Sequence, residues 1–243
     1  MTARSVDIDL HNTRQCSYFE SAPKAGMQPQ GSRYLARQLD ELMEFAHIRS
    51  GDRVLEFGCG MGRYTLPLAE AGVRVEGLDI SRPLLDRLKD FARDHVEIPV
   101  HAGDVVDPPA SVAPPYDAVI GLFALHHVHD IGACVESMAA LVRPGGRVAF
   151  LEPNPYCPLY YLQMAGRRDM TWEGDGGLVR MRPGVIADAM KGAGLRGFQS
   201  RRFGFAPPAV ANRPRGAALE AALESLSALE PVRAFGLFCA ERA

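Results

Sequence analysis

The stretch Arg53-Val54-Leu55-Glu56-Phe57-Gly58-Cys59-Gly60-Met61-Gly62-Arg63 decides the fold class. An apolar run that favours a β-strand ends in three glycines at alternate positions, and a helix-compatible segment follows and stops at Gly72. This is the pattern of a strand, a tight turn and a helix N-terminus. Glycines tolerate positive φ and carry no Cβ atom, so a ligand can lie directly on the backbone and on the exposed N–H groups. A turn without a ligand remains the alternative for the motif alone.

The composition is that of a globular α/β chain. Its 243 residues are 47% hydrophobic and 23% charged, which suffices for one domain with a sizeable core. The formal net charge of −2 provides no basic field. The short arginine clusters at 201–202 and 213–215 are more typical of a solvated face or of ion pairs. We therefore expect no nucleic-acid partner.

Cysteine usage and hydropathy indicate a cytoplasmic protein. The five cysteines are odd in number, widely spaced and without a Cys-x-x-Cys pair, which disfavours a disulfide framework and a structural zinc site. Residues 1–13 lack the apolar centre of a signal peptide. The longest apolar run, residues 118–125, is too short to span a bilayer. We expect no stable membrane insertion.

Alternating strand and helix patterns predict a parallel sheet wrapped by helices. Residues 1–30 are polar and are expected to be irregular. The expected strands are 53–57, 73–78, 98–102, 116–123 and 147–151. The expected helices follow Ser32, Ser81 and Pro183, and also cover 64–71 and 131–142. The strand at 116–123 is apolar nearly throughout, which is typical of a strand buried on both faces.

Two local patterns give more detailed expectations. Pro67 lies inside the helix expected at 64–71, so this helix is either kinked or begins later. Phe91 is expected to share the apolar face of the helix after Ser81 with Leu84, Leu85 and Leu88.

Acidic residues follow two of the expected strands. Asp79 ends the second strand and Asp104 follows the third, at the edge where doubly wound sheets bind ligands. One carboxylate can accept hydrogen bonds from both hydroxyls of a ribose, and another can accept from an adenine amino group. Each aspartate alone could equally cap or turn the chain. Together with the glycine turn, they favour a nucleoside-like ligand.

Several motifs in this order resemble those of one enzyme family. They are Glu56-x-Gly58-x-Gly60-x-Gly62, Asp79, Gly103-Asp104, Tyr116-Asp117-Ala118-Val119, Leu125-His126-His127-Val128 and Arg143-Pro144-Gly145-Gly146. The series resembles class I S-adenosylmethionine-dependent methyltransferases, particularly the small-molecule subgroup, over about residues 50–155. The resemblance implies a Rossmann-like, doubly wound, mostly parallel seven-stranded sheet whose last two strands, 198–205 and 234–240, form an antiparallel hairpin. It also implies one domain, with an N-terminal lid or helix in 1–49, a cofactor-binding core in 50–155 and substrate-covering insertions at 156–182 and 204–232.

The resemblance implies S-adenosyl-L-methionine as the cofactor. The glycine turn would approach its methionine moiety through Gly58, Cys59, Gly60 and Gly62. Around the turn, Glu56 would lie near the ammonium, Phe123 along the methionine, and Arg63 either at the carboxylate or on the surface. Asp79 and Ile80 would hold the ribose and adenine, and Asp104 and Val105 the adenine.

The glycine spacing disfavours a nicotinamide cofactor. A dinucleotide fingerprint is Gly-x-Gly-x-x-Gly, and here the third glycine comes one residue earlier. Glu56 would repel a pyrophosphate but would attract the ammonium of S-adenosylmethionine. A nicotinamide-dependent reductase therefore remains the weaker alternative.

Three histidines follow the fourth expected strand, where a general base would lie. Methyl transfer needs an aligned, desolvated nucleophile, and it needs a base only if that nucleophile loses a proton. His126 and His127 are the catalytic candidates, and scaffolding is the alternative for each. Adjacent loop residues seldom converge on one ion and no suitably spaced carboxylate or thiol completes a site, so we expect no metal.

The segments beyond the fifth strand are expected to cover the substrate. Proline, aromatic and methionine residues at 153–172 suit a lipophilic or aromatic small-molecule acceptor. The candidate substrate residues are Tyr18, Met27, Tyr160, Trp172 and Arg180, with plain packing as the alternative. The predicted reaction is in-line methyl transfer to an O-, N- or C-nucleophile in specialised or lipid-quinone metabolism. A cyclase-type enzyme that binds the cofactor without transferring methyl is the alternative.

The second insertion contains an amphipathic helix. Its apolar stripe consists of Leu219, Ala222, Leu223, Leu226 and Leu229. We expect the stripe to dock on the core, because the opposite face lacks the lysines of an interfacial helix. A dimer contact or a membrane contact is the alternative, so the chain is expected to be a monomer or a homodimer.

Overall fold

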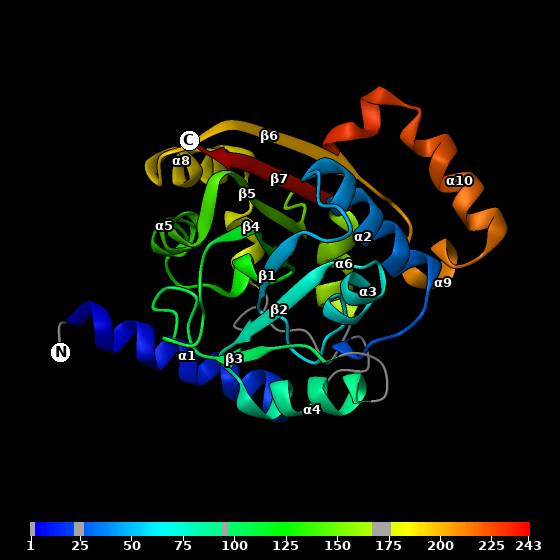
Figure 1. Ribbon diagram of the computed structural model, residues 1–243. Helices are drawn as coiled ribbons and strands as arrows, with labels where there is room; N and C mark the ends of the chain where they lie inside the picture. The colour runs from blue at the N-terminus through cyan, green and yellow to red at the C-terminus, as the bar shows by residue number, and fades with distance from the viewer. Residues whose placement is uncertain (1–2, 22–26, 94–96, 167–175) are drawn as a thin grey trace.

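The computed structural model describes residues 3–21, 27–93, 97–166 and 176–243. Its strands are β1 Arg53–Phe57, β2 Arg74–Asp79, β3 Val100–Ala102, β4 Tyr116–Leu122, β5 Val142–Pro153, β6 Leu195–Phe203 and β7 Phe235–Arg242. They form one sheet in the order β3-β2-β1-β4-β5-β7-β6 (Figure 1). β1 to β5 pair in parallel, and β7 runs antiparallel to both of its neighbours. The predicted doubly wound α/β fold with an antiparallel edge pair is confirmed.

The helices connect these strands and cover both faces of the sheet (Figure 1). They are α1 Ala3–Ser21, α2 Arg33–Phe45, α3 Thr65–Glu70, α4 Arg82–Ala92, α5 Ile131–Leu141, α6 Pro158–Gly166, α8 Pro183–Gly192, α9 Pro208–Ala211 and α10 Pro214–Glu224. Short 3₁₀ turns lie at η2 Leu125–His127, η3 Gly176–Arg180 and η4 Ser227–Val232. The side chains of Ser32 and Ser81 accept hydrogen bonds from Leu35 and Leu84, as their predicted N-cap roles require.

Several boundaries differ from the sequence-based expectation; β6, for example, begins at Leu195 rather than at residue 198. Residues 1–30 are not irregular throughout, because α1 occupies 3–21 and lies against the sheet edge (Figure 1). α3 begins at Thr65, so Pro67 falls in its first turn, where a missing N–H breaks no helical hydrogen bond. β5 begins at Val142 rather than residue 147, because Val142 already pairs with Tyr116.

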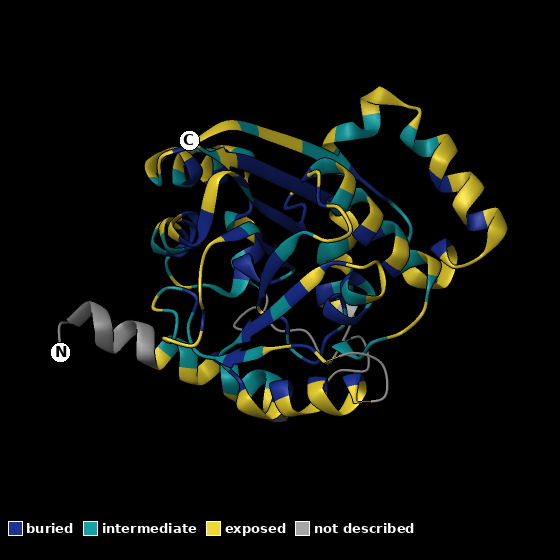
Figure 2. Cartoon of the chain, in the orientation of Figure 1, coloured by how far each residue is buried: buried dark blue, intermediate teal, exposed yellow. Residues whose placement is uncertain are grey.

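Two apolar cores lie on opposite faces of the sheet. On one face, side chains of β1, β4 and β5 pack with α5 and α8. On the other, alternate residues of the same strands pack with α2 and α3. β4 is thus buried on both faces, as predicted (Figure 2). Phe91 is 40% exposed, so its predicted place on the buried face of α4 is wrong.

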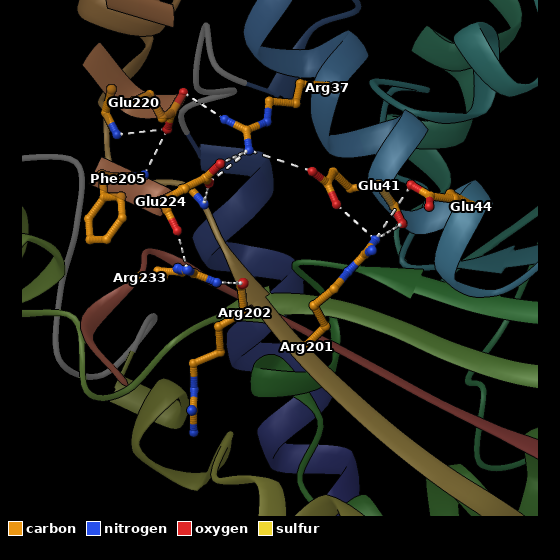
Figure 3. Close-up of polar contacts among 11 residues, drawn as sticks. Arg37, Glu41, Glu44, Arg201, Arg202, Phe205, Glu220, Glu224 and Arg233 are labelled. Atoms are coloured by element: carbon orange, nitrogen blue, oxygen red, sulfur yellow. Dashed lines mark hydrogen bonds and ion pairs between the residues drawn. The ribbon is translucent and has the colours of Figure 1, made fainter. Parts of the chain in front are cut away.

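The helix of the second insertion docks the opposite way from the prediction. Leu219 and Leu226 of the apolar stripe are 56% and 53% exposed, whereas Glu220 is only 5% exposed. Glu220 accepts hydrogen bonds from the backbone N–H groups of Phe205 and Ala206, and it pairs with Arg37 of α2 (Figure 3). An ion pair and hydrogen bonds to backbone N–H groups therefore orient α10, and the predicted docking of its leucine stripe on the core is wrong.

Across the described ranges, no helix is both long and apolar enough to cross a bilayer. All five cysteines are free thiols.

Candidate active site

A cavity of about 210 Å³ lies at the carboxyl ends of β1 to β4. The strand order reverses between β1 and β4, which is the point where doubly wound sheets bind ligands. Ten of the predicted cofactor residues line it: Glu56, Gly58, Cys59, Gly60, Arg63, Asp79, Ile80, Asp104, Val105 and Phe123. Gly62 does not line the cavity. Its φ is +87°, and a Cβ atom there would lie 2.9 Å from Leu88, so this glycine serves the packing behind the turn.

The glycine turn is shaped by backbone geometry. Gly58 and Gly60 have φ values of +65° and +52°, which L-residues rarely adopt. A Cβ atom on Gly58 would lie 2.5 Å from the Cβ atom of Ala124. The N–H of Gly60 donates to Asp79 Oδ2 at 2.8 Å, which fixes the turn to the end of β2.

The two aspartates hold backbone groups at the cavity wall. Asp79 also accepts from the N–H of Ser81 at 2.9 Å, and burial raises the pKa of its carboxyl. Asp104 accepts from the N–H of Val106 at 2.9 Å and from Asn12 Nδ2 at 2.6 Å. Each aspartate thus holds a turn of the chain, the alternative role given above, and both residues also line the cavity.

Glu56 is a buried carboxyl beneath the turn. It is 2% exposed, and its Oε2 accepts from Thr65 Oγ1 at 2.7 Å. Burial raises the pKa of Glu56 from 4.5 to about 8. The group is therefore mainly neutral near pH 7, and a cation placed beside it would favour ionisation.

Helix α1 covers the cavity by bonding to the ends of three strands. His11 Nε2 lies 2.6 Å from the carbonyl oxygen of His127, after β4. Asn12 bonds to Asp104 after β3, and Glu20 accepts from Ser81 Oγ at 2.6 Å after β2. Asn12, Gln15, Cys16 and Phe19 all line the cavity. An N-terminal helix is thus placed as a cover over the site.

The two candidate catalytic histidines have different positions. His126 is 3% exposed, and its Nδ1 lies 2.6 Å from Oε2 of the fully buried Glu152. The other oxygen of Glu152 accepts from the N–H groups of Ala124 and Leu125 at 2.9 and 2.7 Å. His127 lines the cavity, and its ring packs edge-to-face with the Phe19 ring, with a distance of 4.9 Å between the two centroids. Glu152 thus orients the loop that presents His127.

Arg180 braces the same loop from behind. Its guanidinium donates to the carbonyl oxygens of Val128, His129 and His126 at 2.6, 2.9 and 3.2 Å. A Cβ atom on Gly177 would lie 1.7 Å from the His126 carbonyl oxygen, so η3 touches the loop directly. Arg180 therefore lies behind the histidine loop and does not line the cavity.

The other substrate candidates are dispersed. Met27 lines the cavity. Tyr18 packs on Phe19 with ring centroids 5.0 Å apart, and Tyr160 lies on α6, so neither is a wall residue. Trp172 lies outside the described residues. In the part of the chain that the structure describes, no group of three or more His, Cys, Asp or Glu could hold a metal ion.

A family model described as a methyltransferase domain matches residues 27–199, which is more than half of the chain. The chain belongs to the S-adenosylmethionine-dependent methyltransferases. Its cofactor is S-adenosyl-L-methionine. This assignment favours methyl transfer over the nicotinamide-dependent alternative.

Two relatives illustrate the similarity in sequence. The ubiquinone biosynthesis O-methyltransferase of Ralstonia nicotianae is 31% identical over 181 residues, covering 70% of this chain and 73% of the relative. The 27-O-demethylrifamycin SV methyltransferase of Amycolatopsis mediterranei is 34% identical over 127 residues, covering 49% and 46%.

Solved structures share the fold at low identity. Phosphoethanolamine N-methyltransferase 2 of Haemonchus contortus, in complex with S-adenosyl-L-methionine, matches with a TM-score of 0.62 at 16% identity, over 95% of this chain and 57% of that one. The [4+2]-cyclase SpnF matches with a TM-score of 0.58 at 18% identity, over 85% and 80%.

Two buried polar atoms without a hydrogen-bond partner indicate which ligand groups this cavity of the methyltransferase can accept. Arg63 Nε and Gln15 Oε1 are buried without a hydrogen-bond partner among the described residues, and both residues line the cavity. A buried donor and a buried acceptor left unmatched are costly. An amino-acid moiety offers a carboxylate acceptor and an ammonium donor, so the cofactor matches both kinds of group.

Some residues of the methyltransferase site were missed from sequence. Glu152 ends β5, so the rule that identified Asp79 and Asp104 could have found it. Asn12, Gln15 and Phe19 gave no signal, because α1 has only a weak apolar stripe and owes its place to contacts with the sheet edge.

Proposed function

We propose that this methyltransferase methylates a hydroxyl oxygen of a small or medium-sized acceptor with an aromatic or lipophilic body. The carrying observation is that His127 lines one cavity together with Asp79, Asp104 and the glycine turn. A hydroxyl nucleophile must lose a proton, and a neutral imidazole is suited to accept it near pH 7. Both relatives are O-methyltransferases or act on an O-demethylated compound according to their names, which supports oxygen as the acceptor atom.

Different cavity residues are assigned to different parts of the cofactor. We assign Arg63 to the carboxylate and Glu56 to the ammonium, since these are the complementary charges at the turn. Asp79 and Ile80 are assigned to the ribose and adenine, and Asp104 and Val105 to the adenine. When bound, S-adenosylmethionine supplies a methyl group that its sulfonium already activates.

The remaining residues contact the acceptor and position the general base. Phe19, Met27 and Phe123 give the cavity an apolar wall that suits a ring or a hydrocarbon and excludes water. We assign proton acceptance to His127, while His126 and Glu152 hold its loop through the buried contacts described above. Free cysteines and the names of the relatives support the further proposal of a cytoplasmic enzyme in specialised or lipid-quinone metabolism.

The test uses methyl-labelled S-adenosylmethionine with a panel of catechols, hydroquinones and aliphatic alcohols. We expect label on a hydroxyl oxygen with wild type, and a kcat at least about 100-fold lower in His127→Gln, the usual loss of a general base. S-adenosylhomocysteine affinity should stay within about threefold. The exposed His47→Gln serves as the control and should retain wild-type kcat.

Two outcomes would contradict the proposal. One is a His127→Gln enzyme that transfers label at the wild-type rate, which would remove His127 as the base. The other is label on ring carbons of these compounds and on no hydroxyl oxygen. Firm S-adenosylhomocysteine binding without label transfer to any acceptor would favour the cyclase-type alternative.

A further inference from the structure

The residues assigned to the adenine follow an edge strand of only three residues. β3 lies at the edge of the sheet, where it pairs with β2 (Figure 1). The chain then runs along the cofactor cavity through residues 103–106 and continues into the loop 107–115. A short strand with one neighbour is weakly held by its backbone hydrogen bonds. The position of Asp104 therefore depends on side-chain contacts of the strand and the loop.

The side chain of His101 joins the two ends of this segment. His101 is the central residue of β3 and is 7% exposed. Its Nδ1 lies 3.0 Å from Ser111 Oγ, and its Nε2 lies 3.1 Å from Oε2 of Glu76 in β2. Because a carboxylate only accepts, Nε2 donates to Glu76, and in that tautomer Nδ1 accepts from the Ser111 hydroxyl. The contact with Ser111 closes residues 101–111 into a loop that contains Asp104.

Glu76 anchors this contact to the sheet. It accepts from Tyr116 Oη at 2.8 Å and from Arg53 Nε at 2.7 Å. Burial alone would raise the pKa of Glu76, but hydrogen bonds from Tyr116, Arg53 and His101 hold it below its ordinary value, so the group is a carboxylate near pH 7. Arg53 also donates to the carbonyl oxygen of Ala113 at 2.7 Å. Two side chains held by one carboxylate thus reach the loop 107–115.

The loop packs directly behind the residues that line the cavity. A Cβ atom on Gly103 would lie 2.7 Å from the Pro109 ring. Val105 and Val112 are buried in the same apolar cluster. This packing keeps the loop folded without the hydrogen bond between His101 and Ser111. A shift of the loop would nevertheless move the Asp104 carboxylate, because the two are in direct contact through the chain.

We propose that His101 and Ser111 are positioning residues that give the cavity its selectivity for the amino group of adenine. Their hydrogen bond, anchored on Glu76, holds Asp104 at the cavity wall. His101, Ser111 and Glu76 all lie outside the lining of the cavity, so they act through the loop and not by contact with the cofactor. This inference rests on the assignment of Asp104 to the adenine under the proposed function.

The test compares S-adenosylhomocysteine with S-inosylhomocysteine, in which a carbonyl oxygen replaces the adenine amino group. Titration calorimetry of the wild type should show at least about tenfold weaker binding of the inosine ligand, because a hydrogen bond to a charged group is lost. In Ser111→Ala this ratio should fall below about threefold, mainly through weaker binding of S-adenosylhomocysteine. Ser111→Thr keeps the hydroxyl and should restore the wild-type ratio. The exposed Ser200→Ala, on β6 at the other edge of the sheet, is the matched control.

The ratio separates positioning from stability. A variant that is only less stable contains less folded protein for both ligands, which leaves the ratio unchanged. Ser111 is exposed, so its replacement should leave the chain folded. His101→Leu should lower the ratio as Ser111→Ala does, and the double variant should match Ser111→Ala within about twofold, because both residues act through one bond.

Two results would count against the inference, and they are distinguishable. Equal binding of the two ligands by the wild type would overturn the assignment of Asp104 together with the inference. A wild-type ratio in folded Ser111→Ala would overturn the inference alone and would leave the assignment of Asp104 intact.

Discussion

Buried polar groups distinguish the cofactor cavity at the scale of single residues. Burial raises the pKa of both Glu56 and Asp79, although each accepts hydrogen bonds that favour its charged form. Phe123 has a φ of +54°, unusual for a residue with a Cβ atom and costing about 1–2 kcal/mol. Stacking with Tyr64 and the edge of Phe235 hold it there. Such costs are typical of functional sites, where surrounding structure supports them.

Glu56 should make stability depend on pH. The pKa of Glu56 in the folded protein is about 8, above its ordinary value of 4.5. Its neutral form therefore stabilises the fold below pH 4.5, and this contribution is lost as pH rises through 8. Between pH 5 and 8, urea denaturation of the cofactor-free protein should show a fall in free energy of unfolding that Glu56→Gln reduces by on the order of 2–4 kcal/mol. The exposed Glu70→Gln should reproduce the wild-type slope, and an equal slope in Glu56→Gln would refute the account.

Arg180 should stabilise the histidine loop. Replacing Arg180 with alanine leaves three carbonyl oxygens without their charged donor, and such bonds contribute about 1.5–3 kcal/mol each at most. We expect Arg180→Ala to lower the free energy of unfolding by about 2–3 kcal/mol in denaturant titrations, and to lower kcat more than it raises KM. The exposed neighbour variant Arg182→Ala should change neither quantity. A wild-type kcat in folded Arg180→Ala would contradict the positioning role.

Polar contacts hold the helices that cover the carboxyl edge of the sheet. α1 bonds to the segments after β2, β3 and β4, and so it closes the cofactor cavity. α10 is attached to α2 and to the end of β6 by two glutamates (Figure 3). Neither helix is placed by a continuous apolar stripe. Polar contacts to a preformed sheet therefore position the covering elements, whereas apolar packing positions the core helices.

The orientation of α10 can be tested with adjacent residues. Leu219→Ala removes a side chain that is 56% exposed and should change the free energy of unfolding by less than about 0.5 kcal/mol. Glu220→Ala leaves the backbone N–H groups of Phe205 and Ala206 without their acceptor and removes one of the carboxylates that pair with Arg37, so it should cost about 2–4 kcal/mol. Thermal and denaturant unfolding measure both. The reverse ranking would restore the leucine stripe as the docking face.

The whole molecule shows which features a single sequence specifies. The alternation of strands and helices, the parallel pairing and the two helix caps followed from apolar periodicity and capping residues, because these features depend on patterns within short stretches of the chain. The antiparallel edge pair came from the resemblance to a known family, and the strand order was not predicted. The cofactor cavity followed from Glu56, Asp79 and Asp104, because parallel strands bring their carboxyl ends to one edge. The resemblance to a known family supplied the identity of the cofactor.

Other features depend on contacts between distant segments. The resemblance implied an N-terminal lid or helix in residues 1–49, but the pattern of residues 1–30 did not predict α1, because the place of this helix depends on partners roughly 60 to 120 residues away, such as Ser81 and His127. The apolar stripe of α10 gave the wrong face, since periodicity does not register that Glu220 satisfies backbone groups of the preceding loop. His126 and His127 looked equivalent in sequence, and only the structure shows that His126 contacts the buried Glu152 while His127 lines the cavity.

Titration calorimetry with S-adenosylhomocysteine tests the central claim, that the cavity at the ends of β1 to β4 holds the cofactor. Wild type should bind one equivalent. Asp79→Asn, which keeps the size of the side chain but removes its charge, should weaken binding at least about tenfold. The exposed Asp188→Asn should bind as wild type. No binding by folded wild-type protein, or equal affinities for wild type and folded Asp79→Asn, would contradict the claim.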